Sequence, residues 1–248
     1  MAFPTTNWSA LAKATLHGDE QARGALESLC RDYWSAVHAF IRSRGVIEAE
    51  AQDLTQRFLA HVVEKSLFSR ADPLRGRFRS FLLGALVRFL RDAAQKREAL
   101  KRGGGVPHVS LEGSIEQSGV EPSTSEADKV SSFDREWALS ILERALGRIR
   151  SELSQNRPQS HYTVLKTFLP TGADAPSYEQ AASDLRISAS ALRSEVHRLR
   201  LRFRDLVRQE VAKTVSAPHE VVPEMDYLQS VLLDKGSQFS DKTETPRS

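Results

Sequence analysis

The sequence predicts an all-α protein built from two small helical bundles that a flexible acidic linker joins. Apolar residues recur at three- and four-residue steps along most of the chain, and patterns typical of strands are scarce. Between residues 101 and 132 the composition changes to Gly, Ser, Pro and Glu with few large apolar residues, which is typical of a linker. We therefore expect domains at 1–100 and 133–215, with the linker at 101–132 and an acidic tail at 216–248.

Three helices are expected in the first bundle, at residues 21–44, 47–65 and 78–97. Gly45 follows the first helix and can adopt the left-handed conformation that ends many helices. Asp72-Pro73 and Gly76 mark a loop before the third helix. The sequence from Asp72 onward, DPLRGRFRSFLLGALVRF, therefore places a glycine, aromatic rings and arginines at the start of an apolar helix.

One interpretation of this stretch is a site for a single nucleic-acid strand, because aromatic rings stack on unpaired bases while arginines hold phosphates. The alternative is that Phe78 and Phe81 are core residues at the start of a helix, with the arginines solvated around them. The stretch alone favours the second interpretation.

The second bundle is expected to begin at Phe133, where an apolar stripe at helical spacing starts. The segment from residue 177 to 210, SYEQAASDLRISASALRSEVHRLRLRFRDLVRQE, has the form of a helix-turn-helix. Ser177 and Gln180 have the spacing of a capping box before a short helix at 178–185. A tight turn at 186–188 then leads to a long helix that runs to about residue 213, with Ser188 as its N-cap.

The long helix is expected to have one apolar and one basic face. The apolar seam has steps of four, three, four and three residues and consists of Leu192, Val196, Leu199, Phe203 and Leu206. The basic stripe comprises Arg193, His197, Arg200 and Arg204, and it is widened by Ser190, Ser194 and Arg198. Such a helix can bury its seam and present guanidinium and hydroxyl groups to the major groove of DNA. The alternative is a solvated basic face without nucleic acid.

The distribution of charge agrees with a nucleic-acid partner, although the net charge is only +3. Residues 70–102 contain ten Lys and Arg against three acidic residues, and residues 186–208 contain seven arginines against two. An acidic segment at 103–130 separates them. Two basic regions of this kind suggest two contacts with one polyanion.

Signals for other kinds of chemistry are weak. Cys30 is the only cysteine, so it can form neither an intramolecular disulfide nor a thiolate metal site, and we expect a small core residue. His61 and Glu64 lack further ligands for a metal, and no phosphate-binding glycine loop precedes a Lys-Ser/Thr pair. The longest apolar run is too short to span a bilayer, and no secretory signal is present. We expect a cytoplasmic protein that is no enzyme and has no metal, cofactor or membrane partner.

Three motifs occur in the order found in bacterial RNA polymerase sigma factors. The segment EAQDLTQRFLAHVVEK, at 50–65, resembles the D-x-x-Q helix of the extracytoplasmic-function (ECF) class. The segment DPLRGRFRSFLLGALVRFLRD resembles the promoter-melting segment of that class, and the helix-turn-helix resembles its −35-reading motif. The resemblance covers about residues 7–213, interrupted by the linker. The opening FPTTNWS and the acidic tail are similar to a branch with an extended C-terminus.

The resemblance implies a role for individual residues. It implies contacts of Asp53 and Gln56 with the clamp coiled coil of core RNA polymerase. It implies contacts with the −10 promoter element by Arg77, Phe78, Arg79, Ser80, Phe81 and Arg88. It implies contacts with the −35 element by Ser190, Arg193, Ser194, His197 and Arg198.

The chain departs from the pattern of the class at three positions. Arg57 follows Gln56 where an acidic residue is common, and Arg88 stands where asparagine is frequent. Glu195 replaces a basic residue and can either read a cytosine edge or repel phosphate.

The function implied is that of a sigma factor that recruits core RNA polymerase, recognises the −35 and −10 elements and helps to melt promoter DNA. The alternative is a sigma-derived regulator that binds DNA through its helix-turn-helix but has altered or lost polymerase docking. An enzyme is the weakest of the hypotheses. An anti-sigma factor or another regulator is a further conceivable partner.

In the tail, EMDYLQSVLLDKG could form a short amphipathic helix packed on either module or remain a solvated end.

Overall fold

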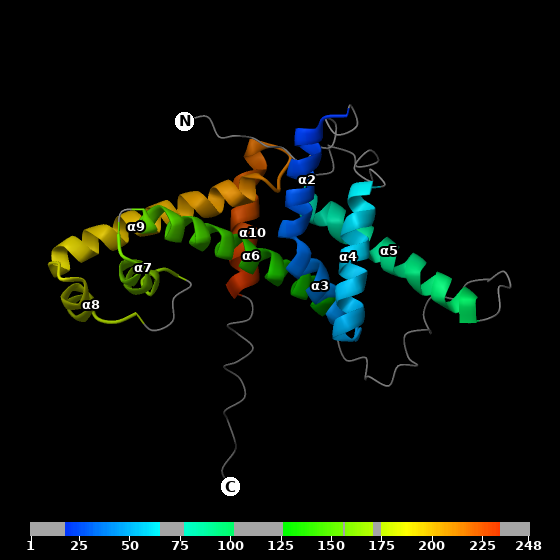
Figure 1. Ribbon diagram of the computed structural model, residues 1–248, viewed down its shortest axis with the longest axis horizontal. Coiled ribbons are helices and arrows are strands. Elements are labelled where there is room, and N and C mark those ends of the chain that lie inside the picture. Colours follow the sequence, from blue (N-terminus) through cyan, green and yellow to red (C-terminus); the bar gives the residue numbers. More distant parts are fainter. Residues whose placement is uncertain (1–17, 65–76, 102–125, 156, 171–174, 234–248) are drawn as a thin grey trace, which may run out of the picture. The chain divides into compact units, whose positions relative to one another are not determined.

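The computed structural model describes residues 18–64, 77–101, 126–155, 157–170 and 175–233, and this part of the chain is helical without strands (Figure 1). The prediction of an all-α protein is confirmed for these residues. The helices are α2 (Glu20–Asp32), α3 (Trp34–Arg42), α4 (Glu48–Glu64), α5 (Phe78–Lys101), α6 (Glu126–Ser154), α7 (Gln159–Lys166), α8 (Tyr178–Leu185), α9 (Ala189–Ala212), the 3₁₀ helix η3 (Pro218–Glu220) and α10 (Val221–Leu233).

The chain divides into two compact units. One comprises residues 2–140 together with 213–248 and is called the bundle unit below. The other comprises residues 141–212 and is called the helix-turn-helix unit. The C-terminal segment thus belongs to the same unit as the N-terminal helices.

Large aromatic side chains form the core of the bundle unit. Tyr33, Phe58, Phe78 and Phe133 are fully buried. Tyr33 contacts Phe78 edge-on, with 5.1 Å between the ring centroids, and lies 6.3 Å from Phe133. Residues from α5 and α6 therefore pack around the ring of Tyr33, which stands at the junction of α2 and α3.

The same tyrosine interrupts the helix that was expected at 21–44, so that prediction is wrong in one respect. The structure has two helices there, which meet at Tyr33, where the backbone has φ −99° and ψ 5°. The Tyr33 N–H bonds to the Cys30 carbonyl, three residues back, instead of continuing the α-helical pattern. The interruption of the helix at Tyr33 coincides with packing of its buried ring. The apolar periodicity of the sequence does not reveal this interruption. Gly45 adopts a positive φ of 79° after α3, as expected.

The described helices also extend into the range that was expected to be linker. Helix α5 continues to Lys101 and α6 begins at Glu126, while residues 102–125 lie outside the described part of the chain. The start of α6 has a physical reason, because Val130 continues the apolar stripe of Phe133 and Trp137 by one helical step.

The C-terminal segment forms the amphipathic helix that was one of the two alternatives for the tail. Helix α10 buries Val221, Glu224 and Leu228 in the bundle unit. Just before η3, the Thr214 carbonyl accepts a hydrogen bond of 2.9 Å from the Phe78 N–H at the start of α5. This hydrogen bond ties the beginning of α5 to the C-terminal segment through the backbone.

The helix-turn-helix unit packs α9 against the second half of α6 and against α7 and α8. Glu210 of α9 is buried and pairs with Arg144 and Arg148 of α6, both at 3.2 Å. Arg202 of α9 forms two hydrogen bonds with Glu152, at 2.6 and 2.9 Å. These arginine–carboxylate pairs connect α6 to the second half of α9.

Candidate nucleic-acid interface

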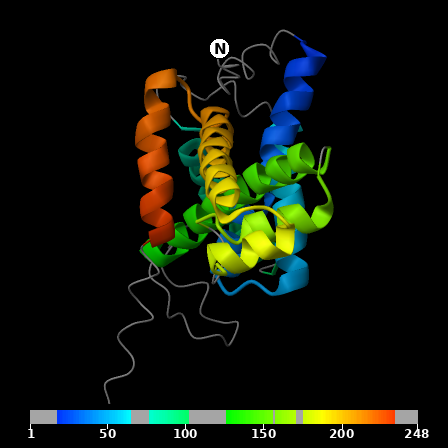
Figure 2. The ribbon, with the colours of Figure 1, turned by 90° about the vertical axis from the view of Figure 1, so that its left-hand side faces the viewer.

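Local sequence signals determine the geometry of the helix-turn-helix. The Ser177 hydroxyl accepts a hydrogen bond from the Gln180 N–H at 3.1 Å and caps α8, while the Gln180 side chain bonds to Asp184 instead of closing the capping box. Arg186 ends α8 in the left-handed conformation, with φ 56° and ψ 42°. Ser188 then caps α9 by accepting from the Ala191 N–H at 3.1 Å. Figure 2 shows α8 lying across the beginning of α9.

The apolar seam predicted for α9 is confirmed, because all five of its residues are buried. The opposite face is exposed, and it carries all the residues that the resemblance assigns to the −35 element: Ser190, Arg193, Ser194, His197 and Arg198. Helical geometry places them on three successive turns of one face. The structure thus brings this group of predicted residues together on one accessible surface.

Two contacts orient Arg193 at the front of this surface. Its Nη2 donates to Glu179 Oε1 at 2.8 Å, and its guanidinium lies 5.3 Å from the centre of the Tyr178 ring. Both Arg193 and Glu179 are exposed, so this ion pair is weak and a stronger acceptor can displace it. Arg200, by contrast, directs its Nε to the Phe168 carbonyl at 2.9 Å.

Glu195 lies on the other side of α9, turned toward α7. Its carboxylate is 3.0 Å from His161 Nε2 and 3.3 Å from Arg157 Nη2, and its side chain is only 13% exposed. Neither reading a cytosine nor repelling phosphate fits this position. The acidic residue instead connects α9 to α7, a role that the sequence did not reveal because the partners lie far away along the chain.

The residues assigned to the −10 element do not share one surface. Ser80 and Arg88 are exposed and Phe81 is half-buried. Phe78 is fully buried against Tyr33, so its ring is not accessible to a base in this structure. For Phe78, the alternative of a core residue at the start of a helix fits the observed position.

Arg79 lies at the centre of a buried cluster of charged and aromatic side chains. Its Nη1 donates to Asp134 at 2.7 Å, and its Nε donates to Glu224 at 3.2 Å. Its guanidinium also lies over the rings of Tyr227, at 4.2 Å, and Trp137, at 5.1 Å. With an exposed fraction of 8%, this side chain is a structural centre of the bundle unit and is not accessible to DNA.

The ionisation states within the cluster follow from these contacts. Burial by itself would lower the pKa of Arg79, but Asp134 and Glu224 outweigh burial and raise the pKa above the ordinary arginine value. Tyr227 donates its hydroxyl to Asp134 at 2.6 Å. Burial, together with this bond to a carboxylate, raises the pKa of Tyr227 to about 12.

Arg77 occupies the rim of the same cluster. Its Nε lies 2.8 Å from Glu224 Oε2, and its side chain is 32% exposed while Glu224 is fully buried. The contact is an ion pair without the alignment of a hydrogen bond, since Glu224 Oε2 has no hydrogen-bonding partner in the described part of the chain.

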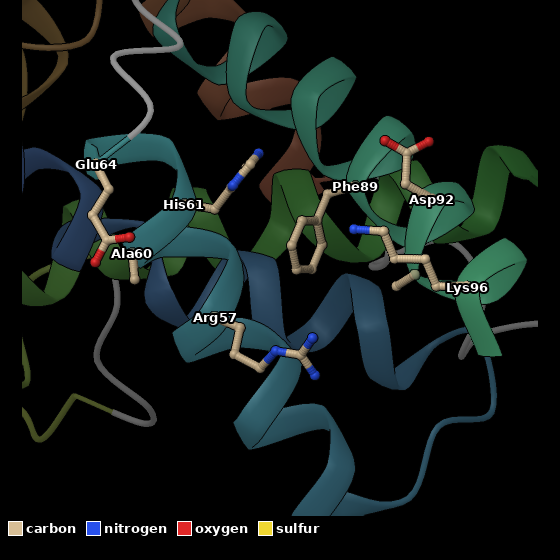
Figure 3. Close-up of a pocket in the computed structure, with 8 residues that line it drawn as sticks. Arg57, Ala60, His61, Glu64, Phe89, Asp92 and Lys96 are labelled. Atoms are coloured by element: carbon tan, nitrogen blue, oxygen red, sulfur yellow. The ribbon is translucent and has the colours of Figure 1, made fainter. Parts of the chain in front are cut away.

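The two residues assigned to polymerase docking, Asp53 and Gln56, are exposed on α4. Asp53 pairs with Arg57 one turn later, at 3.3 Å, with both side chains more than half exposed. A shallow groove of about 380 Å³ adjoins this face between α4 and α5 (Figure 3). Arg57, Ala60, His61 and Glu64 of α4 line it together with Phe89, Asp92, Ala93 and Lys96 of α5.

This groove carries side chains of both charges above the apolar ring of Phe89, which lies 5.4 Å from Phe58 and 5.7 Å from His61.

Among the described residues, no group of three or more His, Cys, Asp or Glu side chains is placed to bind a metal ion. No helix in the described part of the chain is both long and apolar enough to cross a membrane. Cys30 is buried, and burial, together with the nearby Glu27, raises the pKa of its thiol to about 12.

No protein-family model, curated protein or solved structure matches this chain.

Proposed function

We propose that the chain is an ECF-type sigma factor that binds core RNA polymerase, recognises −35 and −10 promoter elements and helps to melt DNA. The observation that carries the proposal is the exposed face of α9, with Arg193, Ser194, His197 and Arg198 presented by a capped helix-turn-helix. Guanidinium, imidazole and hydroxyl groups on the N-terminal turns of such a helix match the donor and acceptor pattern of a major groove. The order of three motifs that resemble the ECF class adds support.

The alternative function is that of a sigma-derived DNA-binding regulator that does not engage polymerase. One observation favours it: Arg57 neutralises Asp53 from within α4. An exposed pair one helical turn apart contributes only about 0.3–0.5 kcal/mol, so a basic partner can displace Arg57. We therefore place polymerase docking through Asp53 and Gln56 first.

Binding to purified core RNA polymerase distinguishes the two functions. The wild-type chain is expected to co-purify with core enzyme, and Asp53→Arg is expected to abolish binding because it reverses the charge on the docking face. The fold should stay intact, because Asp53 is exposed and its only described ion pair is weak.

Glu27→Arg is a matched control. Glu27 is a partly exposed acidic residue that forms a pair of the same spacing with Arg23 on α2, also at 3.3 Å. This variant should bind core enzyme like the wild type. Wild-type protein that binds promoter DNA but not core enzyme would favour the regulator. If the wild type, Asp53→Arg and Glu27→Arg all bound core enzyme equally, Asp53 would not be part of the docking face.

A further inference from the structure

The C-terminal segment contacts three consecutive residues at the start of α5. The Thr214 carbonyl accepts from the Phe78 N–H, and the Glu224 carboxylate contacts both Arg77 and Arg79. These residues begin the segment that resembles the promoter-melting region. Helix α10 thus places a buried anionic group beside Arg77, which under the proposed function would contact the backbone of a DNA strand.

The two arginines differ in how firmly they are held. Arg79 has a second carboxylate, Asp134, and two aromatic rings around it, and it is buried. Arg77 is partly exposed and its described ion pair is with Glu224 alone. If Arg77 moves outward, Glu224 keeps its hydrogen bond from Arg79, so no buried carboxylate is left without a cation.

We propose that Glu224 of α10 is an intramolecular competitor of DNA phosphate for Arg77, and that it lowers the affinity of this chain for DNA. The inference rests on the proposed function and adds a form of regulation to it. A phosphate and a carboxylate both attract a guanidinium, so Arg77 can exchange its ion pair with Glu224 for a charge-assisted contact with a phosphate. Arg79 stays in the cluster in both states.

The test compares DNA binding by variants of the full-length chain, with a labelled single-stranded oligonucleotide of mixed sequence as the probe. Glu224→Gln keeps the shape of the side chain and removes the charge that holds Arg77. We expect roughly fivefold to tenfold tighter binding at low salt, and a salt dependence that is steeper by about one ion. Asp226→Asn removes one exposed carboxylate from the same helix and should leave Arg77 paired.

A double-mutant cycle shows whether the gain comes from Arg77. In an Arg77→Gln background, Glu224→Gln should give no gain, whereas a general loosening of α10 would act in both backgrounds. If the wild type binds DNA and the Glu224→Gln and Asp226→Asn variants bind it with equal affinity, Glu224 does not compete with DNA for Arg77. The proposed function would then still hold. Absence of DNA binding by every variant would overturn both.

A second measurement covers the case in which Glu224→Gln does not fold. In ¹⁵N-arginine-labelled wild-type protein, adding the same oligonucleotide should shift the Nε–H signal of Arg77 and leave that of Arg79 in place. An Arg77 signal that does not move at saturating DNA would contradict the inference.

Discussion

At the scale of single residues, Arg79 shows how burial changes the role of a charge. Arg79→Ala would leave the carboxylates of Asp134 and Glu224 buried without their shared cation. Removing one partner of a buried ion pair costs about 3–5 kcal/mol, so the free energy of unfolding should fall by roughly that amount. Denaturant titration followed by tryptophan fluorescence and circular dichroism measures this loss.

Arg88→Ala provides the control for Arg79, because it removes an exposed arginine from the same helix. Its effect on stability should lie within about 0.5 kcal/mol. If Arg79→Ala were as stable as Arg88→Ala and lost only DNA affinity, the structural role given to Arg79 would be wrong.

Arg193 and Arg204 are both exposed on α9 but should contribute differently to DNA binding. Arg193 lies on the first turns of the helix, where side chains reach base edges, so Arg193→Ala should cost about 1–3 kcal/mol and relax specificity at one position. Arg204 lies farther along, and Arg204→Ala should weaken binding to all sequences alike. Affinities for a set of single-base variants of a selected site test this, and a uniform loss for Arg193→Ala would contradict the placement of α9 in the groove.

At the scale of elements, the attachment of α10 should depend on alkaline pH through Tyr227. The fold raises the pKa of this phenol from 10.0 to about 12, so the folded state favours the neutral form. The stability that the neutral Tyr227 side chain contributes to the fold is therefore fully present below the pKa of the unfolded state. It is lost as the pH rises from 10 toward 12. Tyr227→Phe should lower the free energy of unfolding by roughly 1–2 kcal/mol at neutral pH, because it removes the bond to Asp134.

The two proteins should become more alike as the tyrosine ionises. Urea unfolding of the wild type and of Tyr227→Phe between about pH 9 and pH 12 measures the difference, which should shrink across this window. A difference that stays constant with pH would show that the hydroxyl does not stabilise the fold through its bond to Asp134.

The elements also show which features the sequence could predict. The caps at Ser177 and Ser188 and the turn at Arg186 were predictable, because each depends on contacts within a few residues. The break at Tyr33 coincides with packing of its ring against Phe78 and Phe133, residues far away along the chain, and such contacts are not encoded in the local periodicity.

The same distinction applies to the candidate site. The exposed residues of α9 follow from helical periodicity and were placed correctly on one face. Arg79, by contrast, finds its partners 55 and 145 residues away along the chain, whereas the resemblance implied a contact with DNA. Long-range ion pairs of this kind have no local signature.

At the scale of the whole molecule, the two basic regions of the sequence differ in how accessible they are. The arginines of α9 form an exposed surface, whereas at the start of α5 Arg79 is buried and Arg77 is paired with Glu224. We expect the chain alone to bind DNA mainly through α9, with the contribution of α5 limited by the carboxylate of α10.

In vitro transcription from a library of random DNA, with core RNA polymerase alone or with the full-length chain, shows whether the chain acts as a sigma factor. We expect the chain to cause initiation at selected sites that share two sequence elements upstream of the start. Asp53→Arg should abolish this initiation, and Arg193→Ala should change the preference in the upstream element. Transcription that is the same with and without the chain would contradict the proposed function.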